Sequence, residues 1–293
     1  MDNRSIAMLF ALGFIWGGTF FLTEIALPFL SPMEITWHRV FWAAPLLGGF
    51  VLIRGFTIPT SPKVWGAYLV MGALNNAIPF TLIFWGQLQL TSGVAAILNG
   101  TTAIFGAFVA GLLLRDEPLT LNKLLGAVIG VVGVAVIMGV DALLSLDPYS
   151  LAQWAILGAS LSYAFAGVWG KTTLASQPPQ MNAFGMVSCS ALIMTVVVLI
   201  TDGPPRFAMP AHVWAAVFGF SVLATFVAYL LYFAILKRAG AANLMLVTLI
   251  IPVFAMVLGA IGLNEALGLQ ALFGFAIIAL GLLVTDGRLF RLR

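Results

Sequence analysis

The chain of 293 residues is too apolar for a soluble protein, because 62% of it is hydrophobic and only 8% is charged, against about 25% charged residues in a soluble domain. A chain of this composition needs lipid as its solvent. The formal net charge of +3 is spread over short connections, and the lack of a contiguous basic face excludes nucleic acid as a partner. The single cysteine, Cys189, lies within an apolar run, so neither a disulfide within the chain nor a metal site is expected.

Ten apolar runs are each long enough to cross about 30 Å of hydrocarbon as a helix. In chain order we expect transmembrane helices at residues 5–25, 35–53, 64–86, 93–114, 121–140, 150–170, 182–200, 212–235, 241–262 and 268–286. No small-residue cleavage pattern closes the first run before Glu24, so we interpret it as a retained helix and not as a signal peptide. The connections are short and leave no room for a soluble domain.

The first two predicted helices contain an aromatic candidate and a group of charged residues. Trp16 lies near the expected midplane of the first helix, where its ring could stack on an apolar or aromatic solute. Arg39 and His38 lie about one turn inside the outer end of the second helix, and Glu34 precedes His38 by four residues. A carboxylate partner would lower the cost of burying Arg39. These three residues are candidates for a gate or a charge pair. Arg39 could also attract a substrate carboxylate, and the alternative for Arg39 is snorkelling to the interface.

The third and fourth helices carry amides at a depth where polar groups are expensive. Asn75 and Asn76 lie near the midpoint of the third helix, Pro79 follows one turn later, and Asn99 lies in the fourth. The amides could hold the polar end of a solute in a central cavity, or they could form hydrogen bonds between helices. Pro79 removes a ladder hydrogen bond, so a freed carbonyl could bind an ammonium group. A static kink is the alternative for Pro79.

The second half of the chain supplies tyrosines at comparable depth. Tyr163 lies in the sixth helix, and Tyr229 and Tyr232 lie three residues apart on one face of the eighth. Their rings could stack on a solute and their hydroxyls could bind its polar end, although most aromatic residues in membrane proteins belong to interfacial belts or to packing.

Basic residues give the orientation of the chain. When ten helices alternate in direction, eleven of the 13 basic residues fall on one side: Arg4, Arg54, Lys63, Arg115, Lys123, Lys171, Lys237, Arg238, Arg288, Arg291 and Arg293. Arg206 falls on the other side, and Arg39 lies within a helix. Because Lys and Arg concentrate in cytoplasmic loops, we expect both termini in the cytoplasm.

The two halves of the chain resemble each other. A shift of 148 residues places Gly111 and Glu117 on Gly259 and Glu265, and a shift of 147 residues places Trp16 on Tyr163. A five-helix repeat must reverse its orientation in the second copy. We therefore expect an all-α membrane protein of one integral membrane domain, with residues 1–140 as the first repeat and 150–293 as the inverted second repeat, around a central cavity.

Several motifs together resemble those of a known family. They are the two Gly-x5-Glu elements that end at Glu117 and Glu265, Trp16-Gly17-Gly18, His38-Arg39 and Pro252. This pattern resembles the ten-helix EamA-type branch of the drug/metabolite transporter superfamily, and within it the bacterial exporters of aromatic amino acids. One departure is Ile104, which stands where the second half has Pro252.

The predicted function is that of a secondary transporter. The resemblance implies export of amino acids, aromatic and other neutral ones, across the bacterial inner membrane, and the inverted repeat predicts alternating access. The expected substrate-binding residues are Trp16, Asn75, Asn76, Pro79, Asn99, Tyr163, Tyr229 and Tyr232. We expect no metal, no cofactor, a small-molecule substrate, the lipid bilayer as surroundings and a functional monomer.

The alternatives to amino-acid transport are another substrate and another class of protein. Another small metabolite or a cationic drug is the alternative substrate, although no acidic residue lies at the expected midplane to hold a cation. An intramembrane enzyme would need nucleophiles, acids or metal ligands clustered at depth, and two histidines and one cysteine do not supply them. Coupling to protons and transport down the solute gradient both stay open.

Overall fold

The computed structural model describes residues 2–115, 118–138, 148–244, 246–266 and 268–286. These residues are largely helical, and none of them lies in a strand, in agreement with the all-α prediction. The Gly-x5-Glu element that ends at Glu117 lies partly outside the described residues.

The first half begins with α1 and α2 and continues through a long, locally widened helix. The bounds are α1 Asn3–Ala26, α2 Pro32–Ile53, α3 Pro62–Gly72, η1 Ala73–Ala77, α4 Ile78–Gly86, α5 Ser92–Asn99, α6 Thr102–Leu113 and α7 Leu121–Met138. The segments α3, η1 and α4 follow one another without a gap, and η1 is a π-helical turn. Ser31 and Glu34 form a capping box that starts α2, with Pro32 at its first position.

The second half also begins with two long helices and contains a second π-helical segment, η2. The bounds are α9 Pro148–Thr173, α10 Pro179–Thr201, α11 Ala211–Phe218, η2 Gly219–Val227, α12 Ala228–Leu244, α13 Val247–Leu263 and α14 Leu269–Asp286. The helix α12 is interrupted at Gly240, where φ is 79° and ψ is 167°. A positive φ is readily adopted by glycine, so Gly240 separates the expected eighth and ninth helices.

Helix length and composition support a membrane location. Among the described residues, 6 helical runs are long and apolar enough to cross a membrane, and three shorter apolar helices accompany them, at Leu121–Ile137, Val247–Leu263 and Leu269–Val284. The helix α2 is in neither group, and it contains the polar residues His38 and Arg39.

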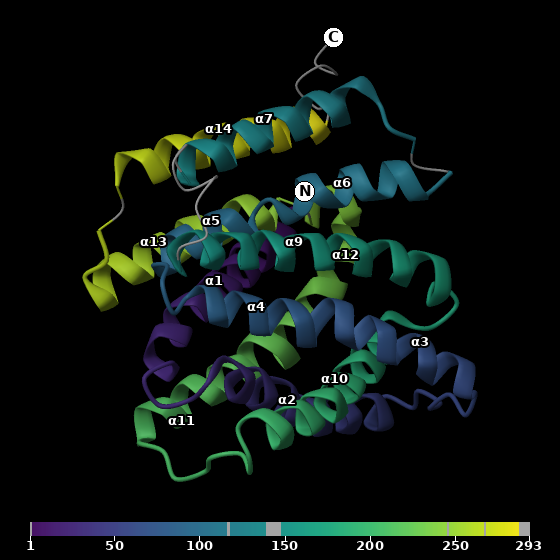
Figure 1. Ribbon diagram of the computed structural model, residues 1–293. Helices are drawn as coiled ribbons and strands as arrows, with labels where there is room; N and C mark the ends of the chain where they lie inside the picture. Colours follow the sequence, from purple (N-terminus) through teal and green to yellow (C-terminus); the bar gives the residue numbers. More distant parts are fainter. Residues whose placement is uncertain (1, 116–117, 139–147, 245, 267, 287–293) are drawn as a thin grey trace.

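The helices pack in pairs that join the two halves of the chain. Figure 1 shows α7 beside α14 at one edge of the molecule, and α2 and α10 at the opposite edge. Between these edges, α1 packs on α13, whereas α9 packs on α5 and α6. In the same way, α4 contacts α9 and α12 contacts α1.

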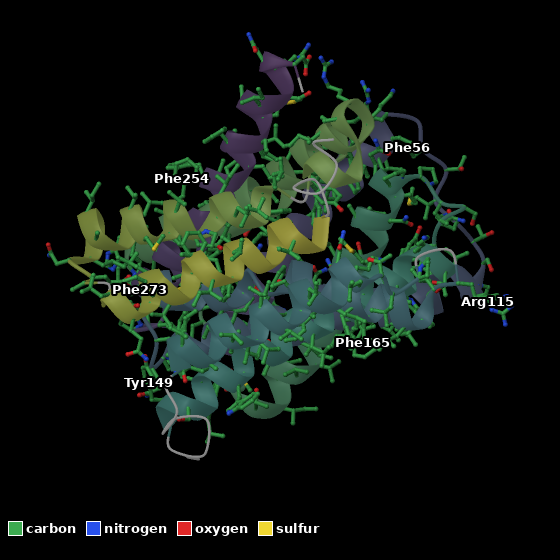
Figure 2. The ribbon with its side chains drawn as sticks, turned by 90° about the horizontal axis from the view of Figure 1, so that it is seen from above. Phe56, Arg115, Tyr149, Phe165, Phe254 and Phe273 are labelled. Carbon is green, nitrogen blue, oxygen red and sulfur yellow. The ribbon has the colours of Figure 1, made fainter. Side chains whose placement is uncertain are left out.

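The outside of the bundle is apolar. Ile53, Ile200 and Ile261 are 86%, 78% and 79% exposed, and Phe165 and Phe273 lie on the outside in Figure 2. An apolar exterior of this extent would be a liability in water. It suits contact with lipid chains, so we interpret the exposed apolar side chains as lipid-facing.

The start of α1 lies beside the far part of α12. Arg238 forms an ion pair with Asp2 at 2.6 Å, and Asp2 also caps α1 by accepting a hydrogen bond from Ser5 N at 3.1 Å. Hydrogen bonds from Ser5 and Arg238 hold the pKa of the Asp2 carboxyl well below its usual range. The N-terminal end of α1 and the stretch around Arg238 therefore share one end of the bundle.

Glycines allow α7 and α14 to approach each other closely, which gives a stability prediction. A Cβ at Gly133 would lie 2.9 Å from Ile278 N and 3.0 Å from Gly274 O, which are backbone atoms that a rotamer change cannot move. We expect Gly133→Ala to destabilise the protein by about 1–3 kcal/mol through overpacking, which thermal unfolding in detergent would measure. Gly106→Ala is the matched control, because nothing lies within 4 Å of its Cβ position. An equal effect of both changes would contradict the close packing.

Candidate functional site

Two π-helical turns, η1 and η2, lie at the centre of the site. In η1 the N–H of Ile78 donates to Ala73 O, five residues back. The following residue, Pro79, has no N–H, and its ring would clash with the carbonyl four residues before it, which explains why the helix widens here. In η2 the N–H of Ala228 donates to Leu223 O and Thr225 O. The carbonyl of Ala224 is thereby left open to side-chain donors, a recurrent use of π-helical turns at functional sites.

An amide–phenol cluster joins η1 to α10 and α12. Asn75 Nδ2 donates to the Tyr229 hydroxyl at 3.3 Å, and this hydroxyl donates to Asn76 Oδ1 at 3.3 Å. Asn76 Nδ2 donates to Ser190 Oγ at 2.9 Å. Asn76 is fully buried, whereas Asn75 and Tyr229 are partly exposed. The structure thus brings three expected residues together, and Asn76 also forms the interhelical hydrogen bonds of the alternative interpretation.

Arg39 lies inside the bundle and does not snorkel. Its side chain is 7% exposed, and its guanidinium carbon lies 3.8 Å from the centroid of the Phe80 ring. Nε donates to Thr225 Oγ1 at 3.2 Å, and Nη2 donates to Ala224 O at 3.4 Å. Tyr163 and Tyr229 are close enough to interact electrostatically with the guanidinium. The snorkelling interpretation is wrong, because the side chain reaches inward to η2 and not outward to the interface.

Aromatic rings from α1 and α12 lie against the same turn of η2. Trp16 Nε1 donates to Ala224 O at 3.1 Å, so Trp16 and Arg39 share one carbonyl. The rings of Trp16 and Tyr232 have centroids 6.1 Å apart. Tyr229 stacks on Phe233 with centroids 6.2 Å apart and planes inclined by 18°. Aromatic and cationic groups therefore surround the widened segment of the eighth predicted helix.

Asn99 ends α5 at a break in the fourth predicted helix. Its backbone carbonyl accepts hydrogen bonds from Thr102 Oγ1 at 2.7 Å and from Ser160 Oγ at 3.3 Å. Its side-chain oxygen Oδ1 is buried and has no hydrogen-bond partner in the described part of the chain. A buried acceptor without a donor is costly, so this oxygen is available to a hydrogen-bond donor on a ligand.

The expected charge pair between Glu34 and Arg39 is not formed. Glu34 Oε2 accepts from Ser31 N at 3.0 Å, and Glu34 Oε1 accepts from Arg206 N at 3.2 Å. The guanidinium Nε of Arg206 lies 3.7 Å from Glu34 Oε1. Glu34 caps its own helix and holds the loop after α10, because its position in the first turn of α2 points it toward that loop.

His38 belongs to the same end of the bundle as Glu34. Its Nδ1 accepts a hydrogen bond from Trp42 Nε1 at 3.2 Å, so its proton lies on Nε2, which donates to Arg206 O at 3.0 Å. Both ring nitrogens are therefore engaged, and the imidazole links α2 to the loop that holds Arg206.

A pocket of about 250 Å³ lies beside Phe233, whose ring contacts Tyr229 and Tyr232. It is lined by residues of α10 and α12, namely Pro179, Gln180, Phe233, Leu236 and Lys237. Phe233 contacts Tyr232 edge to face, with centroids 5.3 Å apart, and stacks on Tyr229. Phe233 therefore both lines the pocket and contacts two tyrosines of the interior cluster.

Several contact residues were not expected from the sequence. Phe80 is an ordinary residue of an apolar helix, and Ala224 contributes through its backbone, so no residue type marks them. Ser190 and Thr225 carried a signal, because they are polar residues in membrane helices. The fold and this interior cluster define the class of the protein: a multi-pass membrane protein whose polar and aromatic groups converge between its helices.

The chain belongs to the EamA-like transporter family, whose sequence profile matches residues 3–139 and 150–285. The expected family is confirmed. Protein PecM of Dickeya dadantii is 24% identical over 278 residues, which cover 93% of this chain and 89% of that protein. Protein PagO of Salmonella typhimurium is 25% identical over 259 residues, covering 87% of this chain and 84% of that protein.

A further relative and a solved structure are similar to this chain over most of its length. The "Uncharacterized inner membrane transporter YedA" of Escherichia coli K12 is 27% identical over 280 residues, covering 94% of this chain and 87% of that protein. A crystal structure with 17% sequence identity superposes with a TM-score of 0.68 and covers 100% of both chains, which shows a shared fold. The names of these relatives state no substrate, so the narrower likeness to aromatic amino acid exporters is a proposal.

Proposed function

We propose that this protein is a secondary transporter that exports amino acids, aromatic and other neutral ones, across the inner membrane by alternating access. It works as a monomer without cofactor or metal, and it crosses the membrane ten times. Membership of a transporter family supports the transport activity. The amino-acid class, the direction and the mechanism are inferences from the site and from the sequence motifs.

Inverted five-helix repeats are supported by three features. The family profile matches each half of the chain separately. Several helix contacts also recur when each helix is exchanged for its counterpart: α1 packs on α13 as α9 packs on α5 and α6, and α7 meets its own counterpart α14. A shift of 148 residues also places η1 within η2. Two such halves can rock against each other around a shared site.

Cytoplasmic termini are supported by the bias of the basic residues and by one contact. Asp2 and Arg238 form an ion pair, so the start of α1 and the end of the eighth predicted helix lie on the same side. This agrees with eight crossings between them, because an even number of crossings returns the chain to the side on which it began. The pocket beside Lys237 then lies at the cytoplasmic end. Such a pocket suits entry of a solute that is exported.

The observation that carries the proposal is the convergence of Arg39, Trp16 and Tyr229 on η2 and η1. A positive group, amides and aromatic rings together match a solute with a carboxylate and an apolar body. The free Oδ1 of Asn99 offers an acceptor for an amino group. A cationic drug fits less well, because the charge inside this cluster is positive.

Efflux from proteoliposomes tests the proposal. Purified protein is reconstituted in liposomes that contain labelled phenylalanine, threonine or glucose, and loss of label is measured against liposomes without protein. We expect protein-dependent loss of phenylalanine and threonine and retention of glucose, because the site offers a charged and an aromatic subsite. Equal loss of glucose, or retention of both amino acids, would contradict the assignment.

A further inference from the structure

Arg39 carries a charge that the described residues do not balance. Its partners are the hydroxyl of Thr225, the carbonyl of Ala224 and the face of Phe80, all of them neutral. No carboxylate of the described residues lies within ion-pair distance of its guanidinium. A buried charge that lacks a counter-charge is costly, so this site is predisposed to accept an anion.

The carboxylates in neighbouring helices are engaged elsewhere. Glu34 accepts from Ser31 N and from Arg206 N. Glu24 accepts from Gln87 Nε2 at 3.0 Å, and Glu265 accepts from Ser92 N at 3.0 Å. None of these three carboxylates therefore competes with an anionic ligand for the guanidinium of Arg39.

The donor geometry of Arg39 fits a carboxylate. A guanidinium has five N–H donors in one plane, and the hydrogen bonds to η2 use one on Nε and one on Nη2. Both N–H groups of Nη1 and the second N–H of Nη2 form no hydrogen bond with the described residues. Two parallel N–H groups can bind both oxygens of a carboxylate at once.

The groups that could bind an amino group form weaker interactions than Arg39 forms with a carboxylate. The free Oδ1 of Asn99 is a neutral acceptor, and neutral hydrogen bonds contribute less than charge-assisted ones. An ammonium in this cluster would also face the positive charge of Arg39 at low dielectric. The aromatic rings of Trp16, Tyr163 and Tyr232 contact an apolar body whether or not it carries an amine.

We propose that Arg39 binds the carboxylate of the substrate and that the amino group is dispensable, so that aryl-substituted carboxylic acids are ligands of this protein as well as aromatic amino acids. This assignment rests on the proposed function and extends its substrate class to aryl carboxylic acids that lack an amino group. It makes Arg39 the specificity-determining residue of the site, with the aromatic rings as the second determinant.

Binding of three matched probes tests the assignment. Purified protein in detergent is titrated with L-phenylalanine, with 3-phenylpropionate, which lacks the amine, and with phenethylamine, which lacks the carboxylate, and thermal stabilisation is measured. We expect 3-phenylpropionate to bind within a few-fold of phenylalanine and phenethylamine to bind at least tenfold more weakly, a difference of about 1.4 kcal/mol. Equal or tighter binding of phenethylamine, or no binding of 3-phenylpropionate, would overturn the proposal.

A pair of variants locates the selectivity. Arg39→Gln is expected to abolish the preference for 3-phenylpropionate over phenethylamine, and Arg39→Lys is expected to retain part of it, because lysine keeps the charge and loses the fork of donors. Arg54→Gln is the matched control, because Arg54 is an exposed arginine after the end of α2. A preference that survives in folded Arg39→Gln would remove Arg39 from this role. If Arg39→Gln does not fold, the wild-type titration with the three probes decides the question.

The proposed function can fail independently of this inference. Selective binding of 3-phenylpropionate together with absent phenylalanine efflux would refute amino-acid export and leave the carboxylate site standing. Phenylalanine efflux that phenethylamine inhibits and 3-phenylpropionate does not would refute the carboxylate site and leave export standing.

Discussion

Tyr229→Phe is expected to slow phenylalanine efflux from proteoliposomes by about tenfold while the protein stays folded, a change of about 1.4 kcal/mol that matches the loss of one net hydrogen bond. The Tyr229 hydroxyl accepts from Asn75 Nδ2 and donates to Asn76 Oδ1, both at 3.3 Å. The substitution removes these bonds and keeps the ring that stacks on Phe233. The Asn75 amide then loses its hydrogen bond to the hydroxyl and keeps its contacts with Asn76 Oδ1 at 3.3 Å and Met186 Sδ at 3.7 Å. Initial efflux rates measure the consequence of this weaker positioning.

Tyr68→Phe is the matched control for this substitution. Tyr68 lies among the helices and is fully buried, and its hydroxyl has no hydrogen-bond partner among the described residues. Removal of an unpaired hydroxyl is expected to leave efflux unchanged and stability equal or higher.

We expect Asn75→Ala and Asn99→Ala to reduce efflux as Tyr229→Phe does. Normal efflux in all three site variants would eliminate these residues as the binding site.

The extent of the helices could be predicted from the sequence because hydrocarbon length sets the length of an apolar run. The expected run 5–25 corresponds to α1 at Asn3–Ala26, and the expected run 121–140 begins, as α7 does, at Leu121. The break between α5 and α6 was not expected. Gly100 and Thr101 separate these two helices within a single apolar run, and hydropathy does not distinguish a straight helix from a broken one.

The partners of the polar residues could be predicted only in part. Amides and tyrosines at membrane depth need partners, which correctly places Asn75, Asn76 and Tyr229 in the interior. Which of them meet depends on the rotation of each helix about its axis, and a nearly uniform apolar sequence does not fix that rotation. The burial of Arg39 was missed for the same reason.

The contributions of backbone atoms to the site could not be predicted from the sequence. Pro79 gives a chemical cause for η1, whereas η2 contains no proline, so nothing in its residue types predicts a widened turn. The carbonyl of Ala224, which Trp16 and Arg39 share, becomes available only through that turn. Repeat symmetry is the one signal that relates the two turns, since η1 falls within η2 after the shift of 148 residues.

The loop after α9 and the loop after α10 are expected to lie on opposite sides of the membrane, which labelling of single cysteines would measure as an all-or-none difference. In a Cys189→Ala background, Ser176→Cys and Ala208→Cys each introduce one thiol at an exposed position. An impermeant maleimide added to intact cells is expected to label the thiol at position 208. The thiol at position 176 is expected to react only after permeabilisation, because Lys171 lies on the predicted cytoplasmic side.

The unmodified protein is the control for this experiment, because Cys189 is its one cysteine and is buried against α3. It should remain unlabelled in intact and in permeabilised cells. Labelling of position 176 in intact cells would reverse the predicted orientation, and with it the assignment of the pocket beside Lys237 to the cytoplasmic end. Equal labelling of positions 176 and 208 in intact cells would mean that α10 does not cross the membrane. In that case α2 and α10 could not be equivalent membrane-crossing helices of two inverted halves.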